Sequence, residues 1–170
     1  MQRILILGPS GSGKSTLAVK LGEKIDLPVA HLDTCYFRPG WVIEDKEIFR
    51  KKVIDLASKD LWVIDGNYLS HKETLDYRLQ RADTVIFLNF SRWTCLWSVF
   101  KRFLKHRGST RPDVAVGCDE KIDLEFIQYI WNFPKKSPAR IYAALNEHGK
   151  HTTFINLNNF TEVEEFIKNL

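Results

Sequence analysis

Near the start of the chain, the segment Gly8–Ser15 has the spacing of a phosphate-binding loop. It reads GPSGSGKS and fits the pattern G-x-x-x-x-G-K-S/T. The glycines let the backbone curl so that successive N–H groups face one anion. Lys14 can neutralise the β- and γ-phosphates of a nucleotide, and the Ser15 hydroxyl suits Mg²⁺. The segment therefore predicts ATP and Mg²⁺ as cofactors. The expected nucleotide contacts are Gly8, Ser10, Gly11, Ser12, Gly13, Lys14, Ser15 and Thr16.

Two aspartates follow apolar segments that are typical of buried strands. Asp65 ends the run Leu61–Ile64, and Asp33 follows the predicted strand 28–32. The carboxyl ends of parallel strands open onto the binding crevice of an open α/β sheet. Asp65 is therefore predicted to hold Mg²⁺ together with Ser15, or to accept the proton of an acceptor hydroxyl. A turn or helix-cap role beside Gly66 is the alternative. Asp33 is predicted to be an acceptor ligand or base.

The elements that must position these residues alternate between strand-like and helix-like segments, which indicates an α/β fold around a parallel sheet. Predicted strands cover 3–7, 28–32, 61–64, 84–89 and 152–157. Predicted helices cover 14–25, 44–59, 91–106, 123–131, 138–147 and 161–170, the fourth and fifth being divided by Pro134 and Pro138. No repeat or linker interrupts this order, so we expect a single domain over residues 1–170.

The chain carries its positive charge unevenly. Its net charge is +4, and the segment 91–111 holds six basic residues and no acidic one. One interpretation is a lid, in which Arg102 binds the nucleotide while Arg107 and Arg111 stabilise the transferred phosphoryl group. A second is nucleic-acid binding, with Trp93 and Trp97 stacking on bases; we place both rings on an apolar stripe facing the core, which disfavours it. The third is a solvated basic face.

Composition excludes several classes of protein. The 170 residues are 44% hydrophobic and 27% charged, unlike a disordered or collagen-like chain. No apolar run reaches the roughly 18 residues of a membrane span, so we expect no membrane partner. The three cysteines form no CxxC pair, and no histidine has a ligand-like partner in the sequence. With a strand directly after the first residues in place of a signal peptide, these features predict a cytoplasmic protein.

Several segments together resemble one family. They are the phosphate loop, His31–Asp33, Arg38–Trp41, Asp65–Tyr68, Gly108–Asp113 and Trp131–Pro134. In combination they look like the bacterial DNA topology modulation protein (FlaR-like) family, small P-loop proteins similar to adenylate kinase and shikimate kinase. The resemblance covers about residues 3–145. It implies a three-layer P-loop fold with a five-stranded parallel sheet. It also implies an acceptor-binding insertion at about 34–60 and a short arginine lid at about 108–121.

The sequence also departs from adenylate kinase, because Asp65-Gly66 is followed by Asn67-Tyr68 where that family has an aromatic residue, a proline and an arginine. We therefore do not expect AMP as the acceptor. The predicted acceptor contacts are Asp33, Arg38, Asn67 and Arg78. The two arginines can hold an anion by fork-like hydrogen bonds, which favours an acceptor bearing a phosphate or a carboxylate.

The sequence thus predicts a MgATP-binding kinase that transfers the γ-phosphoryl group to a nucleotide, a nucleoside or another small acceptor. The alternative is a nucleotide-dependent regulatory or DNA-binding protein that influences DNA topology. The predicted catalytic set is Lys14, Asp33, Asp65, Arg107 and Arg111. Direct nucleic-acid binding is the less favoured partner, and the sequence predicts no oligomeric state.

Overall fold

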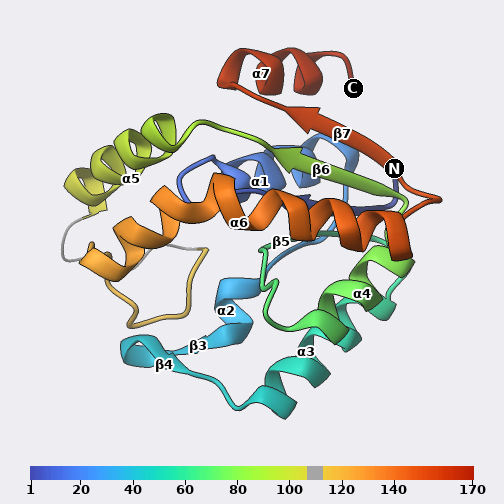
Figure 1. The fold of residues 1–170 in the computed structure, drawn as a ribbon. Helices are drawn as coiled ribbons and strands as arrows, with labels where there is room; N and C mark the ends of the chain where they lie inside the picture. The colour runs from blue at the N-terminus through green and yellow to red at the C-terminus, as the bar shows by residue number, and fades with distance from the viewer. Residues whose placement is uncertain (107–112) are drawn as a thin grey trace.

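The computed structural model describes residues 1–106 and 113–170, and a five-stranded parallel sheet lies at its centre (Figure 1). The strands are β1 (Arg3–Leu7), β2 (Val29–His31), β5 (Trp62–Asp65), β6 (Thr84–Leu88) and β7 (Thr153–Leu157). Their order in the sheet is β2-β5-β1-β6-β7, and every neighbouring pair is parallel. This confirms the predicted α/β fold with five parallel strands.

Helices cover both faces of the sheet, which gives three layers (Figure 1). One face packs against α3 (Lys46–Ser58), α4 (Lys72–Arg81) and α6 (Leu124–His148). The other packs against α1 (Lys14–Ile25), α5 (Arg92–His106) and α7 (Phe160–Lys168).

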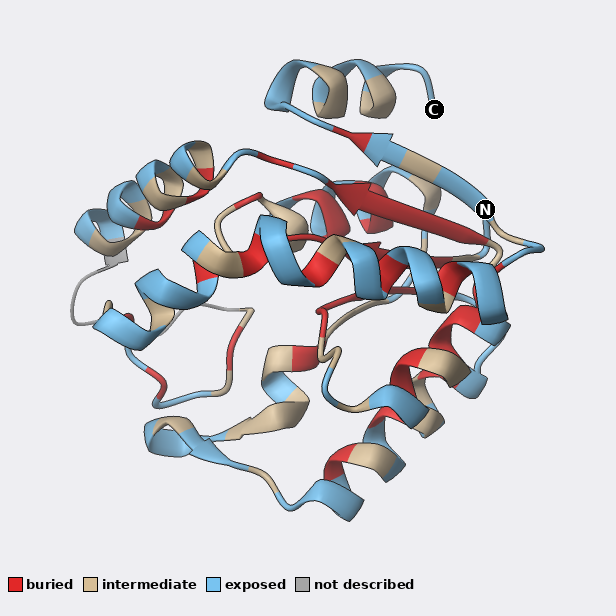
Figure 2. Ribbon diagram, in the orientation of Figure 1, coloured by how far each residue is buried: buried red, intermediate tan, exposed pale blue. Residues whose placement is uncertain are grey.

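The apolar strand sequences supply both layers of the core. In β1, Leu5 and Leu7 point into one cluster while Ile4 and Ile6 point into the other, as the period-two geometry of a strand requires. β6 is buried along its whole length (Figure 2). A strand that is buried on both faces reads as a continuous apolar run, which is why TVIFL shows no alternation. β1 and β6 are therefore held in place by the core, and they fix the positions of the loops at their carboxyl ends.

A small antiparallel unit follows β2, inside the segment predicted to be the acceptor insertion. It consists of α2 (Leu32–Tyr36), β3 (Phe37–Arg38), a 3₁₀ turn (Pro39–Trp41) and β4 (Val42–Ile43). Three hydrogen bonds tie it to the segment 117–119. The Gly40 N–H donates to the Gly117 carbonyl at 2.9 Å, Trp41 Nε1 donates to the Asp119 carbonyl at 2.8 Å, and the Cys118 thiol donates to the Arg38 carbonyl at 3.3 Å. This hairpin and that segment therefore form one wall.

The prediction of two helices on either side of Pro134 and Pro138 is wrong, because α6 runs unbroken from Leu124 to His148. Each proline removes one helical hydrogen bond. Side chains that repeat every three or four residues bury one side of the helix in the core: Ile130, Phe133, Ser137, Ile141 and Leu145. Tertiary packing on both sides of the prolines thus outweighs their local cost.

Two other expectations also needed the tertiary structure. The sequence predicts no helix between residues 64 and 84, yet α4 fills most of that span. On α3, helical periodicity predicts that Ile48 faces inward together with Val53, Leu56 and Ala57, yet Ile48 is 47% exposed, while Phe49 is fully buried. Among the described residues, none of the helices has the length and apolarity needed to cross a bilayer.

Gly22 sets how closely α1 approaches the edge of the sheet. A Cβ at this position would lie 2.4 Å from Val29 Cγ2 and 2.8 Å from the Leu27 carbonyl oxygen. Overpacking of this kind costs about 1–3 kcal/mol, which exceeds the helix-propensity gain of alanine. We expect Gly22→Ala to lower the free energy of unfolding by about 1–2 kcal/mol in urea titrations. Lys20→Ala, on the exposed side of the same helix, should change it by less than about 0.5 kcal/mol; equal stability of both variants would contradict this close packing.

Candidate functional site

The phosphate loop leaves β1 and enters α1 as predicted. Gly8, Gly11 and Gly13 all have positive φ angles, at 148°, 84° and 89°. Left-handed backbone at alternating positions turns successive N–H groups toward one concave side, which forms an anion-binding nest at the positive end of the helix dipole. Ser12 Oγ and Lys14 Nζ both donate to the Pro9 carbonyl, at 2.8 and 2.9 Å. The lysine therefore folds back across its own loop.

Gly11 has a second reason to be glycine, namely the packing of α5. A Cβ there would lie 2.4 Å from the Cys95 carbonyl oxygen and 2.9 Å from Val99 Cγ2. The inner side of α5 thus rests directly on the loop backbone. No larger residue fits between them without moving the helix or the loop.

Asp65 lies at the end of β5, where the sequence places it, and is 4% exposed. One carboxylate oxygen, Oδ1, is 3.0 Å from His31 Nδ1. The other, Oδ2, is buried and has no hydrogen-bond partner among the described residues. A buried carboxylate oxygen without a partner is costly unless a cation or a donor satisfies it. This oxygen is therefore the atom of the site best placed to take a ligand.

His31 is a site residue that the sequence reasoning missed. β2 and β5 pair in parallel with His31 directly opposite Asp65, so both side chains emerge at the same edge of the sheet. The hydrogen bond to Asp65 raises the pKa of His31, and the charges of Asp65, Asp113 and Asp33 add to this effect, while burial opposes it. The available signal was a histidine at the end of one predicted strand and an aspartate at the end of another.

Lys14 is held in the same electrostatic cluster. Burial lowers the pKa of its ammonium group, while the neighbouring charges of Asp65 and Asp33 counteract that effect. Opposite charges stabilise an ion most strongly where water is excluded. The lysine of the phosphate loop and both predicted strand-end carboxylates therefore share one crevice.

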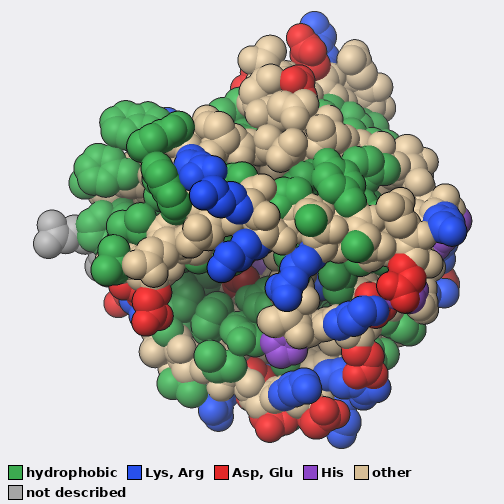
Figure 3. Space-filling view, viewed as in Figure 1, with side chains coloured by type: hydrophobic (Ala, Val, Ile, Leu, Met, Phe, Trp, Pro, Cys, Tyr) green, Lys and Arg blue, Asp and Glu red, His purple; other side chains and the backbone are tan. Residues whose placement is uncertain are grey.

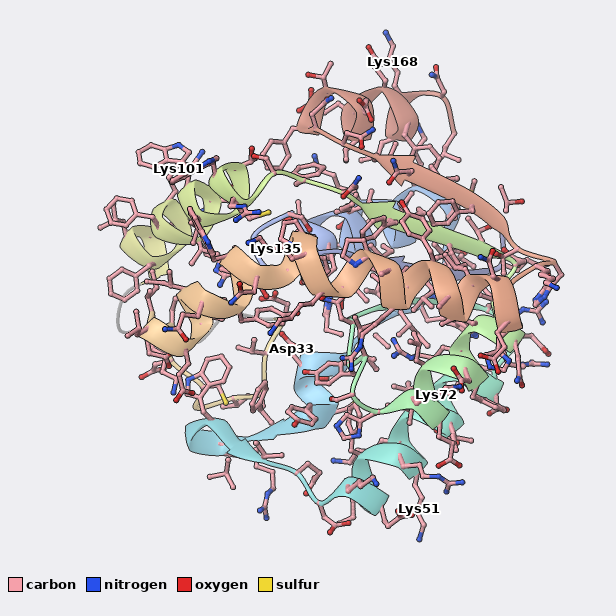
Figure 4. All side chains as sticks on the ribbon, viewed as in Figure 1. Asp33, Lys51, Lys72, Lys101, Lys135 and Lys168 are labelled. Atoms are coloured by element: carbon pink, nitrogen blue, oxygen red, sulfur yellow. The ribbon has the colours of Figure 1, made fainter. Side chains whose placement is uncertain are left out.

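Asp33 projects from the start of α2, on the side of that helix toward α6 (Figure 4). Its Oδ1 accepts a hydrogen bond from the Tyr68 hydroxyl at 2.5 Å. The Tyr68 ring packs against Tyr36 and Phe49, with centroids 4.6 and 5.0 Å apart. Burial and the charge of Asp33 raise the pKa of Tyr68, which keeps the phenol protonated and donating. Tyr68 thus fixes the orientation of Asp33.

Asn67, predicted to bind the acceptor, joins the two central loops. Its Nδ2 donates to the Gly8 carbonyl at 2.7 Å, and its Oδ1 accepts from the Gly8 N–H at 3.0 Å. Nδ2 also lies 3.2 Å from the Tyr129 hydroxyl of α6. These bonds tie the end of β5 to the start of the phosphate loop, so the placement of Asn67 favours a positioning role over the predicted acceptor contact.

Arg78, also predicted to bind the acceptor, is fully buried beneath the loop that follows β5. Its guanidinium donates to the carbonyls of Thr74, Gly66 and Asn67 at 3.1, 2.7 and 2.9 Å. Burial lowers its pKa to about 10, so it stays charged at neutral pH. With Nε, Nη1 and Nη2 each bonded to backbone, this arginine supports the loop and does not extend into the crevice.

Two further predicted cations, Arg38 and Arg102, each lie near a carboxylate. Arg38 is exposed on β3, with Nε 3.6 Å from Glu44 Oε1. Arg102 donates from Nε to Glu120 Oε1 at 2.8 Å, and its charge lowers the pKa of Lys14, which places it near the phosphate loop. Arg107 and Arg111, the predicted lid arginines, lie outside the described residues, as does part of the predicted lid at 108–121.

Beside the loop lies a hollow of about 110 Å³. It is lined by residues of the phosphate loop, α1 and α7: Ser12, Gly13, Thr16, Leu17, Lys20, Phe160, Val163 and Glu164. Ser15 is half-buried and Ser10 is half-buried at the loop tip, while Thr16 is exposed. The hollow continues the phosphate nest toward the carboxyl-terminal helix.

The prediction that Trp93 and Trp97 belong to the core is wrong. They are 67% and 60% exposed on the outer side of α5. The stripe predicted from their spacing does exist, but the helix buries its other side, through Cys95 and Val99. The hydrophobic side chains over α5 are prominent in Figure 3.

The donor set fits Mg²⁺ better than a transition metal. Among the described residues, no group of three or more histidine, cysteine, aspartate or glutamate side chains can hold a metal ion. Mg²⁺ usually binds through one or two protein oxygens and completes its shell with water and substrate phosphates. Asp65 Oδ2, which is buried without a partner, and the Ser15 hydroxyl supply that kind of donor.

No family model matches the chain. Several solved structures, however, share its fold. Shikimate kinase from Acinetobacter baumannii, solved in complex with shikimate, superposes with a TM-score of 0.64 over 99% of this chain and 90% of that chain, at 15% identity. A gluconokinase from Sinorhizobium meliloti 1021 superposes with a TM-score of 0.56 over 98% of this chain and 87% of that chain, at 16% identity. The YorR protein from Bacillus subtilis, in complex with phosphorylated GDP, superposes with a TM-score of 0.54 over 98% of this chain and 91% of that chain, at 18% identity. The overall fold is therefore that of these P-loop proteins.

Curated proteins match a shorter stretch. The ATP-binding subunit ClpX 2 of the Clp protease from Wolinella succinogenes is 42% identical over 59 residues, and ClpX from Treponema denticola is 42% identical over 59 residues. The match covers 34% of this chain and only 15% and 14% of those proteins. It is thus a local likeness to ATP-binding subunits.

The site makes a prediction about two histidines whose pKa values shift in opposite directions. Asp65 raises the pKa of His31, whereas burial together with Lys46 and Arg78 lowers that of His71. In NMR titrations of the metal-free protein, we expect His31 to titrate above 6.5 and His71 below it, with His31→Asn and His71→Asn providing the assignments. A raised folded-state pKa adds stability below the unfolded value of about 6.5, and this stability is lost as the pH rises through the folded value. The stability lost in His31→Asn should therefore be largest at acidic pH. A loss of stability that grows as the pH rises would contradict the hydrogen bond between His31 and Asp65.

Proposed function

We propose that this protein is a MgATP-dependent phosphotransferase that passes the γ-phosphoryl group of ATP to a hydroxyl of a small acceptor. The observation that carries the proposal is the convergence of Lys14 with Asp33 and Asp65, from two different strand ends, on one crevice. Two of the similar solved structures are a shikimate kinase and a gluconokinase, which supports kinase chemistry on this fold. The local match to ATP-binding subunits supports ATP as the nucleotide.

On the donor side, the loop N–H groups and Lys14 bind the phosphates, with Arg102 nearby. Ser15 and Asp65 Oδ2 would hold Mg²⁺, which would supply neutralisation of the negative charge that develops during phosphoryl transfer. His31 orients Asp65 through its hydrogen bond to the other carboxylate oxygen. The hollow against Phe160 receives the nucleoside part of ATP, next to Thr16.

On the acceptor side, Asp33 accepts the proton of the attacking hydroxyl. A bond forms between the acceptor oxygen and the γ-phosphorus, the bond from that phosphorus to the β–γ bridging oxygen breaks, and ADP leaves. Tyr68 holds the carboxylate in place from the opposite side. Arg38, at the open rim, faces an acceptor that carries a phosphate or a carboxylate. Arg107 and Arg111 remain the predicted lid arginines.

The proposed domain plan is one P-loop domain with an acceptor-binding insertion at about 34–60. The hydrogen bonds between the β3–β4 unit and residues 117–119 support it, because they join the insertion to the described part of the predicted lid. Membership of the DNA topology modulation protein family is likewise a proposal. It rests on the sequence motifs of that resemblance alone.

The first experiment is ADP release from MgATP across a panel of nucleoside monophosphates, nucleosides and small hydroxy acids. We expect acceptor-dependent release by the wild-type protein and a loss of at least 100-fold in Lys14→Ala. Losing one preorganised charge stabiliser costs roughly 3 kcal/mol or more of activation free energy. Circular dichroism should show native structure in the variant. ATP binding without release for any acceptor would instead favour a regulatory protein, and turnover that survives in Lys14→Ala would remove the loop from catalysis.

Two isosteric variants separate the roles of the carboxylates. Asp33→Asn should lower kcat by about 100-fold or more with little change in ATP binding, because a general base contributes 10²–10⁴-fold. Asp65→Asn should also lower kcat more than it weakens ATP binding, and it should raise the Mg²⁺ concentration needed for half-maximal rate. Equal losses in kcat and ATP affinity for Asp65→Asn would assign that residue to ground-state binding.

A further inference from the structure

The outer sides of α5 and α6 expose large apolar side chains that nothing in the proposed reaction uses. Four lie on α5 and three on the first half of α6, and we call them together the aromatic face: Trp93, Trp97, Phe100, Leu104, Leu124, Ile127 and Trp131. Leu124 is 68% exposed and Leu104 61%. Clustered apolar exposure of this extent marks an interaction surface, whereas scattered single residues do not.

Helical spacing explains why these side chains form rows. On α5 the intervals between them are four, three and four residues, so they follow one side of the helix for three turns. The opposite side of α5 holds Cys95 and Val99 against the phosphate loop. The ring of Trp93 meets that of Trp131 edge-on at 5.0 Å, which joins the two rows into one surface.

Four cations accompany these side chains: Arg92 and Lys101 lie over the rings of Trp131 and Trp97, and Lys105 and Lys135 follow Lys101 and Trp131 by one turn of α5 and α6. In the described part of the chain, none of them forms an ion pair, whereas Arg50, Lys52, Lys72 and Arg102 elsewhere each contact a carboxylate. Lys101 and Lys135 project from α5 and α6 in Figure 4. The surface thus combines apolar side chains with uncompensated positive charge, which complements an anionic partner.

Two other occupants fit this combination less well. A second copy docked face to face would bring the same four cations of each chain together, and like charges repel across an interface. Single-stranded nucleic acid needs free ring faces for base stacking. Here Arg92 already covers the Trp131 ring at 4.7 Å and Lys101 lies over Trp97 at 5.9 Å. Three of the seven side chains are also aliphatic.

We propose that the aromatic face docks this protein on an anionic lipid surface. Tryptophan, phenylalanine and leucine on one side of a helix enter the boundary between headgroups and acyl chains, and flanking lysines reach the lipid phosphates. The hydrophobic side chains stand out from the molecule over α5 (Figure 3), as insertion requires. This mode lies in the plane of the bilayer and does not span it.

The test is co-sedimentation of the full chain with vesicles of phosphatidylcholine containing 30% phosphatidylglycerol, compared with phosphatidylcholine alone. We expect binding only to the anionic vesicles. Lys101→Glu/Lys105→Glu should weaken it by roughly 25-fold or more, because each basic residue near an anionic surface contributes about fivefold. Lys51→Glu/Lys59→Glu, on α3 and directly after it, makes the same change in net charge away from this surface and should bind far better. Trp97→Ser should weaken binding and reduce the quenching of tryptophan fluorescence by brominated acyl chains.

Several results would overturn the proposal. These are no binding to anionic vesicles, equal weakening by the α3 control, or a dimer in sedimentation velocity that Trp97→Ser dissociates. Tight binding of a single-stranded oligonucleotide that anionic vesicles do not displace would also overturn it, in favour of the nucleic-acid interpretation. Circular dichroism and ADP release by the variants establish that they are folded. Because the aromatic face contributes no residue to the proposed catalytic site, either proposal can fail alone.

Discussion

The half-buried ammonium group of Lys14, folded back across a curled backbone loop, is the constraint on which the site depends. Water cannot solvate Lys14 fully there, so anionic groups must, and the carboxylates of Asp33 and Asp65 lie close enough to oppose the effect of burial on its pKa. Each carboxylate then has its own support, Tyr68 for Asp33 and His31 for Asp65. The two carboxylates thus stabilise the charge of Lys14, and a hydrogen bond from a neighbouring side chain orients each carboxylate in turn.

Hydrogen bonds to the backbone also fix the loops around these charged groups. Asn67 pairs with both backbone groups of Gly8, so the loops after β1 and β5 cannot separate independently. Arg78 then holds the carbonyls of Gly66 and Asn67 from below. Two side chains that the sequence predicts to touch an acceptor therefore hold the backbone of the loops after β1 and β5.

Much of this could be predicted from the sequence where a single segment contains the whole signal. The phosphate loop, the five strands and the strand-end position of Asp65 are all local patterns, and the structure contains each of them. His31 could not be predicted, because its partner depends on β2 pairing with β5 in a register that no local pattern encodes. The same reason applies to Asn67 and Arg78, whose partners come from distant loops or from backbone carbonyls.

The stripe on α5 shows a different limit of sequence patterns. Periodicity identifies a helix with two distinct sides, but it does not say which side faces the core. The larger and more aromatic side, with Trp93 and Trp97, faces outward, while the inner side places the smaller Cys95 and Val99 against the loop backbone. Close packing, and not hydrophobicity, decides the orientation of this helix.

That contact at Gly11 makes α5 a rigid spacer of one helix diameter, with the phosphate loop on one side and water on the other. The Cys95 carbonyl leaves no space into which the loop could relax. Any force that tilts α5 therefore changes the curvature of the loop, and any change in that curvature tilts α5. Trp93 and Trp97, on the outside of the helix, are therefore natural reporters of the shape of a loop that lies against its opposite side.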